Sequence, residues 1–370
     1  MLWERNGCMF TASFGIFLFG LIAAAGGGAL GAAIGGNYAF GFTGLMILAA
    51  FGVKAATGSS VWFDYVAFGP FFGPHVAFAG GAAAAAYAAN KRHYMVPNAH
   101  LSNSDVAQTG KDVSEPLARL NRPDVLLMGS LFGMGGYAVK IGIDNIPWLG
   151  AHTDSVAMTV IISGMTARLV FGGSLMNPEK YNAGASGFMA KIAPTADHAW
   201  LRYQERPSQF LTIGMLFGIA AGAVSVAVAT IDGFAAVAQT LPFAMSAVVI
   251  FWLVLGHQMP VQHHATIVAG LFAVKFLPIF VGGSEFHWNG AWFEAGKAGA
   301  WDSNTWMMAA LVILLAGVAG AISMSLAELS NRLFYARGNS HIDPPAMAIW
   351  ISTILILGSA SLFSGPMLVG

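Results

Sequence analysis

Two copies of a His-x-Asp motif stand out in a chain that is otherwise poor in ionisable groups. The first copy is His152-Thr-Asp154 and the second is His341-Ile-Asp343, and each is followed by an Ala and a Met at the same spacing. An imidazole exchanges protons near neutral pH, and a nearby carboxylate favours its charged form. We therefore predict that His152, Asp154, His341 and Asp343 couple the activity of the protein to proton movement.

Each aspartate of the motif also has a structural explanation. Asp154 and Asp343 stand at the first turn of an expected helix, where a carboxylate caps free backbone N–H groups and suits the positive end of the helix dipole. Pro344 and Pro345 fit such a helix start, because proline is favoured at the first helical position. Capping explains the two aspartates but not the histidine that precedes each of them, so both roles stay open.

A second group of polar residues lies in two stretches that glycine and proline interrupt. The group consists of His75 in the first stretch and of His257, Gln258, Gln262, His263 and His264 in the second. A broken helix exposes backbone N–H and C=O groups at membrane depth, where they are tolerated only if they line a cavity or are buried in protein. We therefore predict that these six residues bind a substrate.

The histidines of this group also allow a metal site. His75, His257, His263 and His264 would offer four nitrogen ligands, but no HExxH, CxxC or EF-hand pattern accompanies them. The single cysteine, Cys8, excludes an internal disulfide and a site of several cysteines. We expect no bound cofactor, and metal binding by the histidines stays open.

The elements that must position these residues are strongly apolar. Of the 370 residues, 56% are hydrophobic and 9% are charged, whereas a soluble domain has about 25% charged residues. A bilayer core is crossed by about 20 apolar helical residues. Ten stretches of suitable composition are expected to cross it, at 9–34, 39–57, 66–90, 124–143, 153–173, 209–231, 234–256, 260–282, 305–328 and 343–365. The sequence thus predicts an all-α polytopic membrane protein.

The recurrence of two separate blocks at one common offset predicts an internal duplication. His152 falls on His341, and His75 falls on His264. We expect one transmembrane repeat at 1–173, a cytoplasmic linker at 174–207 and a second repeat at 208–370. Because five spans per repeat is an odd number, the two repeats would be inverted in the membrane. The third and eighth spans are expected to be broken or re-entrant, and two re-entrant hairpins would make the halves parallel instead.

Basic residues set the expected orientation. Most of the Lys and Arg residues lie in 91–123, 174–207 and 329–340, which are therefore expected to be cytoplasmic. Both termini would then lie outside. The Ala- and Gly-rich, Lys-poor composition favours a bacterial source, and hence a multi-pass protein of the inner (plasma) membrane.

These features favour a secondary transporter and not an enzyme. We expect a small polar solute to bind between the broken spans at the interface of the repeats, with protons as the coupling ion. The alternatives are a channel or facilitator for a small solute, and a membrane subunit of a larger complex. The expected partners are a small-molecule substrate and the lipid bilayer. The zero net charge gives no indication of nucleic-acid binding, and Gly-rich surfaces are compatible with a homo-oligomer.

Overall fold

Membrane-crossing helices make up most of the protein. A computed structural model describes residues 9–91, 110–282, 286–288 and 300–363, and these ranges contain helices and no β-strand. Nine helical segments within them are long and apolar enough to cross a membrane, so the protein is a polytopic helical membrane protein. These segments are formed by α1 (Met9–Ile34), α2 (Gly36–Thr57), α5 (Pro123–Asp144), α7 (Ser155–Ala167) with its continuation Arg168–Gly172, α9 (Pro207–Ala229), α10 (Thr240–Val248) with α11 (Ile250–Val254), α12 (His263–Val281), α13 (Ser303–Ser330) with its continuation Asn331–Tyr335, and α14 (Pro344–Phe363).

The third expected span is not one continuous helix. A short helical segment at Trp62–Ala67 is followed by non-helical backbone, and α3 (Ala77–Asn90) then has only 14 residues. Pro70 and Pro74 remove backbone donors in the intervening stretch. A Cβ at Gly69 would collide with the backbone of the preceding helical turn, so this turn requires glycine.

The eighth expected span begins after a similar interruption. α11 ends at Val254, and the backbone from 256 to 262 is non-helical before α12 starts at His263. Gly256 has a φ of 93°, which lies in the left-handed region that favours glycine. His75 and His263 therefore both lie where a non-helical segment leads into a helix.

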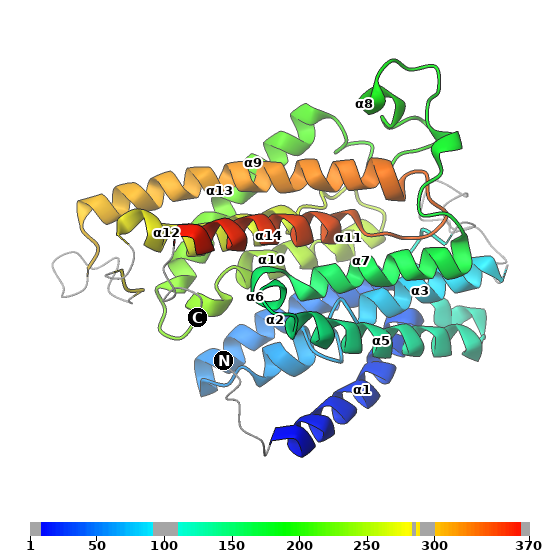
Figure 1. Ribbon diagram of the computed structural model, residues 1–370, viewed down its shortest axis with the longest axis horizontal. Coiled ribbons are helices and arrows are strands. Elements are labelled where there is room, and N and C mark those ends of the chain that lie inside the picture. The colour runs from blue at the N-terminus through cyan, green and yellow to red at the C-terminus, as the bar shows by residue number, and fades with distance from the viewer. Residues whose placement is uncertain (1–8, 92–109, 283–285, 289–299, 364–370) are drawn as a thin grey trace.

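Two long helices of the first half of the chain run opposite to two of the second half. In Figure 1, α5 ends on the left beside α6 (Leu149–His152), whereas α13 begins on the left and ends on the right. Likewise, α7 runs from left to right, and α14 has its C-terminal end on the left.

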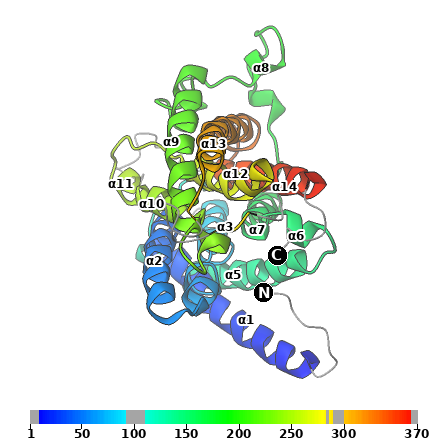
Figure 2. The ribbon, with the colours of Figure 1, turned by 90° about the vertical axis from the view of Figure 1, so that its left-hand side faces the viewer.

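In each half of the chain, the first long helix packs against two later helices. α1 packs against α5 and α3, and α9 packs against α13 and α12. Between the halves, α2 contacts α10 and α7 contacts α14. Figure 2, which looks along the helices, shows α9, α12 and α13 on one side and α1, α2 and α5 on the other, with α3 and α7 between them.

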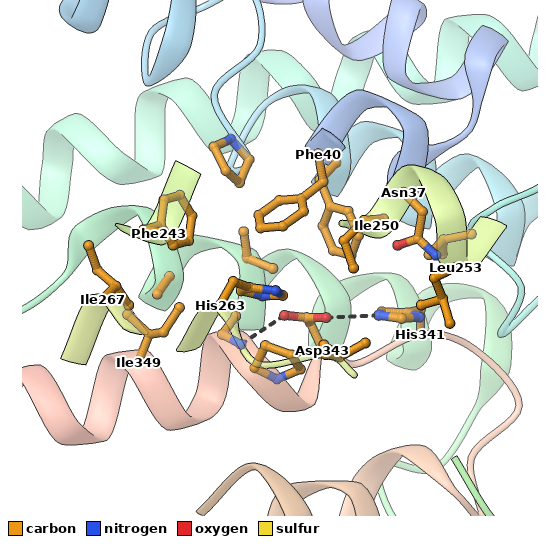
Figure 3. A pocket seen from close by; sticks show the side chains of 18 of the residues that line it. Asn37, Phe40, Phe243, Ile250, Leu253, His263, Ile267, His341, Asp343 and Ile349 are labelled. Atoms are coloured by element: carbon orange, nitrogen blue, oxygen red, sulfur yellow. Dashed lines mark hydrogen bonds and ion pairs between the residues drawn. The ribbon is translucent and has the colours of Figure 1, made fainter. Parts of the chain in front are cut away.

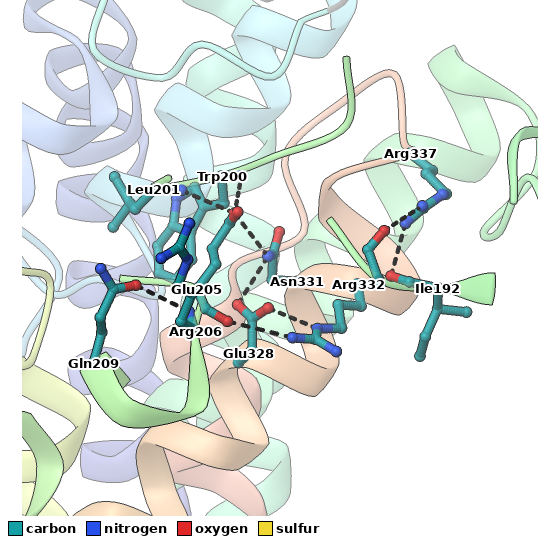
Figure 4. A network of polar contacts seen from close by, with 11 residues as sticks. Ile192, Trp200, Leu201, Glu205, Arg206, Gln209, Glu328, Asn331, Arg332 and Arg337 are labelled. Atoms are coloured by element: carbon teal, nitrogen blue, oxygen red, sulfur yellow. Dashed lines mark hydrogen bonds and ion pairs between the residues drawn. The ribbon is translucent and has the colours of Figure 1, made fainter. Parts of the chain in front are cut away.

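Buried polar groups tie the segment between the halves to the second half (Figure 4). Glu205, near the end of this segment, accepts a hydrogen bond from Asn331 Nδ2 at 3.4 Å through its side chain and one from Arg332 Nη2 at 3.3 Å through its carbonyl oxygen. Arg337, which is almost fully buried, donates to the carbonyl of Ile192 at 3.0 Å. These bonds hold the segment 174–207 against the C-terminal end of α13 and the turn that follows it.

Candidate functional site

A cavity of about 660 Å³ lies between the two halves of the chain. The first half lines it with α2, the segment 111–114 and the start of α7, and the second half with α10, the non-helical segment before α12, and α14. The cavity reaches the surface at the exposed residues Gly256, His257 and Gln258, and it extends inward to Leu271 and Leu357. Its volume and its few polar groups among apolar side chains are typical of a small-molecule site.

Both aspartates of the repeated motif line this cavity, and each caps the helix that follows it. Asp154 Oδ1 accepts a hydrogen bond from the backbone N–H of Ala157 at 2.8 Å. Asp343 Oδ2 accepts one from Ala346 at 2.8 Å. The capping explanation is therefore confirmed for both residues, while their role in proton coupling stays a prediction.

The two histidines of the motif have different partners. His341 Nε2 lies 3.1 Å from Asp343 Oδ1, and its Nδ1 lies 3.1 Å from the carbonyl oxygen of Lys111 (Figure 3). His152 turns away from Asp154, since its Nδ1 lies 2.7 Å from the carbonyl oxygen of Trp148 and its ring stacks on that indole at 4.7 Å. His152 is also not among the residues that line the cavity. The structure thus brings the histidine and the aspartate together in the second copy of the motif only.

The two contacts of His341 compete for the single hydrogen of a neutral imidazole. A carbonyl oxygen only accepts hydrogen bonds, so a hydrogen bond to Lys111 needs a hydrogen on Nδ1. A hydrogen bond between Nε2 and Asp343 needs a hydrogen on Nε2 or on the carboxyl group. Both bonds can therefore form together only if the pair holds one proton more than a neutral histidine beside an ionised aspartate.

The predicted substrate-binding residues separate into two groups. His257, Gln258 and His263 line the cavity. His75, Gln262 and His264 are buried and are not among its lining residues. In the described part of the chain, His75 Nδ1, Gln262 Oε1 and both ring nitrogens of His264 have no hydrogen-bond partner. These three residues therefore lie behind the cavity wall.

The structure does not assemble the four-histidine metal site. The described residues contain no group of three or more His, Cys, Asp or Glu side chains that could hold a metal ion. His257 is exposed at the mouth, whereas His75 and His264 are buried in different helical units. The physical reason is the separation between the segment before α3 and the segment before α12, which belong to different halves.

Four phenylalanines form a lining that the sequence analysis missed. Phe40, Phe68, Phe78 and Phe243 all face the cavity. The ring centroid of Phe40 lies 5.8 Å from that of Phe243 and 4.5 Å from that of His263. With 27 phenylalanines in an apolar chain, no signal in the sequence distinguishes these four from lipid-facing rings.

The linker between the halves contributes to the cavity as well. Residues 199–203 line it, and Tyr203 Oη donates to the carbonyl of Met259 at 2.7 Å. Burial raises the pKa of Tyr203 to about 12, so its phenol stays neutral and keeps this bond. The next residue, Gln204, donates to the carbonyl of Val261 at 2.8 Å and accepts from its N–H at 2.9 Å. The linker therefore fixes the non-helical segment that leads to His263.

The chain matches a family model over residues 11–365, a range that includes both halves and every element around the cavity. No curated protein and no solved structure matches it. The description of the family gives no activity, so the geometry of the cavity is the basis for any functional conclusion. By this match, the protein belongs to the family of unknown function DUF7973.

Proposed function

We propose that the protein is a secondary transporter that couples the movement of a small polar solute to protons. The observation that carries the proposal is the cavity between two oppositely directed halves, with the His341–Asp343 pair in its wall. A solute site at the interface of two structural repeats, next to interrupted helices, is the arrangement common to many secondary transporters.

The proposed architecture is a pair of inverted five-helix repeats. It is supported by the matching contacts of α1, α3 and α5 with those of α9, α12 and α13, and by the opposite directions of α5 and α13. In this arrangement the third and eighth spans cross the membrane as broken helices. The cavity then faces the side that holds the basic segments, which we assign to the cytoplasm of a bacterial cell.

The coupling step is assigned to the shared proton of His341 and Asp343. When both hydrogen bonds of His341 are made, this pair holds one proton more than a neutral histidine beside an ionised aspartate would hold. Release and recapture of that proton would change the charge of the cavity wall by one unit without moving the backbone. Because substrate and proton would meet at the same wall, occupancy by one would affect the other.

Proton movement in proteoliposomes tests the proposal. The purified protein is reconstituted with a pH-sensitive dye trapped inside, and amines, amino acids, organic anions and urea are added outside in turn. We expect at least one solute to change the internal pH, and Asp343→Asn to abolish that change because an amide does not exchange the proton. Asp302→Asn is the matched control, since Asp302 caps α13 by accepting from Thr305 at 2.7 Å but does not line the cavity.

The two outcomes separate coupled transport from a channel. A solute flux that runs downhill, ignores protonophores and is unchanged in Asp343→Asn would replace the transporter proposal with a facilitator. If none of the solutes moves or shifts the internal pH, the proposal of a small-solute transporter fails.

Cysteine labelling tests the inverted repeats. In a Cys8→Ser background, Ala118→Cys and Ser303→Cys place single thiols at exposed positions before α5 and at the start of α13. A membrane-impermeant maleimide should label them from opposite sides of oriented vesicles. Labelling of both thiols from one side would contradict the inversion.

A further inference from the structure

We propose that the cavity binds a small organic cation, such as an amine or a quaternary ammonium ion, and exchanges it for the proton of His341 and Asp343. The inference deepens the proposed function, and it rests on that function in taking the cavity as the substrate site. Three features of the wall carry it: aromatic side chains, an excess of carboxylates over basic side chains in the lining, and a buried imidazole with an unsatisfied ring nitrogen.

The aromatic faces surround the inner part of the cavity (Figure 3). Phe40, Phe78 and Phe243 are at most 9% exposed, and the ring plane of Phe40 makes angles of 68° and 86° with the rings of Phe78 and Phe243, at centroid distances of 6.2 Å and 5.8 Å. All three side chains line the enclosed space. A desolvated cation over such faces is attracted by the ring quadrupole, and the attraction exceeds that for a neutral group of the same size.

Carboxylates supply the negative charge of the wall. Asp154 and Asp343 both line the cavity, and each oxygen that caps a helix keeps a second lone pair. The ammonium group of Lys111, the lysine in the wall, bonds to the protein itself: it donates to the carbonyl of Ala336 at 3.1 Å and lies over the ring of Tyr335. Arg202 is exposed and donates to the carbonyl of Ala196. The residues that line the cavity include three aspartates (Asp112, Asp154 and Asp343) and two basic side chains (Lys111 and Arg202), so the lining favours a positive ligand when the aspartates are ionised.

His263 is a polar group that the protein itself leaves unsatisfied. It is 5% exposed, it lines the cavity beside Asp343, and its Nδ1 has no hydrogen-bond partner in the described part of the chain. Leaving a buried polar side chain without a partner costs stability unless something else bonds to it. Nδ1 is sealed from the cavity, so a ligand would reach the ring through Nε2, which accepts a hydrogen bond from an ammonium or hydroxyl group when Nδ1 carries the hydrogen.

The exchange conserves charge. When the cation enters, the His341–Asp343 pair loses its shared proton to solvent, which leaves an imidazole donating to Lys111 and a carboxylate facing the cation. One positive charge enters and one leaves. The ionisable groups that face the pair from the surrounding elements are Lys111, Asp112, Asp154, Arg168, His263 and Tyr335. None of them has to change its charge for the exchange to balance.

Calorimetry with isosteric ligands tests the inference. Choline is compared with its neutral isostere 3,3-dimethylbutan-1-ol and with the anion 3,3-dimethylbutanoate, and n-butylammonium with butan-1-ol, on the full chain in detergent. At least one cation should bind about tenfold more tightly than its neutral partner. Titrations in two buffers of different ionisation enthalpy should show close to one proton released per cation, and the Kd should rise about tenfold per unit as the pH falls into the range where the pair is protonated.

Matched variants locate the effect. Asp343→Asn should remove the proton release and weaken cation binding at least tenfold, whereas Asp302→Asn should change neither. Phe243→Leu, which keeps an apolar side chain but removes the aromatic ring, should weaken the binding of choline severalfold. Phe276→Leu is its control, because Phe276 is equally buried in α12 but does not line the cavity.

The possible results separate this inference from the transporter proposal. Equal or tighter binding of the neutral or anionic ligands, or no binding of either cation, would overturn the inference while leaving transport of another solute possible. Cation binding with proton release but no flux into proteoliposomes would keep the inference and overturn the transporter.

Discussion

Replacing Gln204 should disturb the segment that leads into α12. Its side chain makes two hydrogen bonds to the backbone of Val261, at 2.8 Å and 2.9 Å, and the two residues are 4% and 3% exposed. In Gln204→Ala, the N–H and the carbonyl of Val261 would both be left buried without a partner. Each such group costs about 1–3 kcal/mol, so the expected loss of stability is about 2–6 kcal/mol.

Two measurements check this loss. For domains of 150–250 residues, about 1 kcal/mol lowers Tm by about 2–4 °C, and a longer chain shifts less, so Tm in detergent should fall by several degrees. Hydrogen exchange followed by mass spectrometry should show faster exchange in peptides that cover residues 256–262. An opening cheaper by about 2 kcal/mol corresponds to exchange about 30-fold faster.

Gln209→Ala is the matched control. Gln209 also uses its side chain on the backbone, by accepting from the N–H of Arg206 at 3.1 Å, but this hydrogen bond is exposed at the start of α9, so water replaces it when it is lost. If Gln204→Ala has the Tm of Gln209→Ala and unchanged exchange over 256–262, then the linker does not position this segment. The account of how His263 reaches the cavity would then be wrong.

Three further variants test the packing and the helix starts. Asp154→Ala should lose about 1 kcal/mol of unfolding free energy whereas Asp154→Asn, which still caps, should lose little; equal Tm losses would contradict the capping role. Gly31→Ala should lower the free energy of unfolding by about 1–3 kcal/mol, because the added methyl group would collide with the backbone of Ala77. Gly26→Ala is the control, since its methyl group would meet no atom. Equal Tm values for the two variants would refute the close contact of α1 and α3. Arg168→Lys should lower Tm by several degrees, because a single ammonium cannot replace the fork of donors that bonds two buried turns; an unchanged Tm would show that charge alone suffices.

The sequence predicts the spans well because length and hydropathy decide them. The expected span 209–231 corresponds to α9 at Pro207–Ala229, and 260–282 to α12 at His263–Val281. The expected span 66–90 is the exception, since Pro70 and Pro74 break it into pieces of which neither is long enough alone. Local composition therefore determines where helices lie and where they stop.

The side-chain directions at the site could not be predicted in the same way. His152 and His341 occupy equivalent positions in the repeated motif, but their rings contact different groups. The ring of His152 contacts the carbonyl oxygen of Trp148, one turn earlier in the chain, whereas the ring of His341 contacts the carbonyl oxygen of Lys111, from a distant part of the chain. Likewise His264 follows His263 directly but points behind the wall. Such choices depend on tertiary neighbours, which one sequence does not reveal.

The wide spacing of the wall residues along the chain has a consequence for biosynthesis. The wall of the cavity begins with Asn37, passes through Lys111 and is completed by α14, which follows the other described helices in the chain. Until α14 has been made, Lys111 lacks the imidazole that its carbonyl oxygen contacts, and the cavity lacks one side. The wall can therefore close only after α14 has been translated, however early the other wall residues have folded.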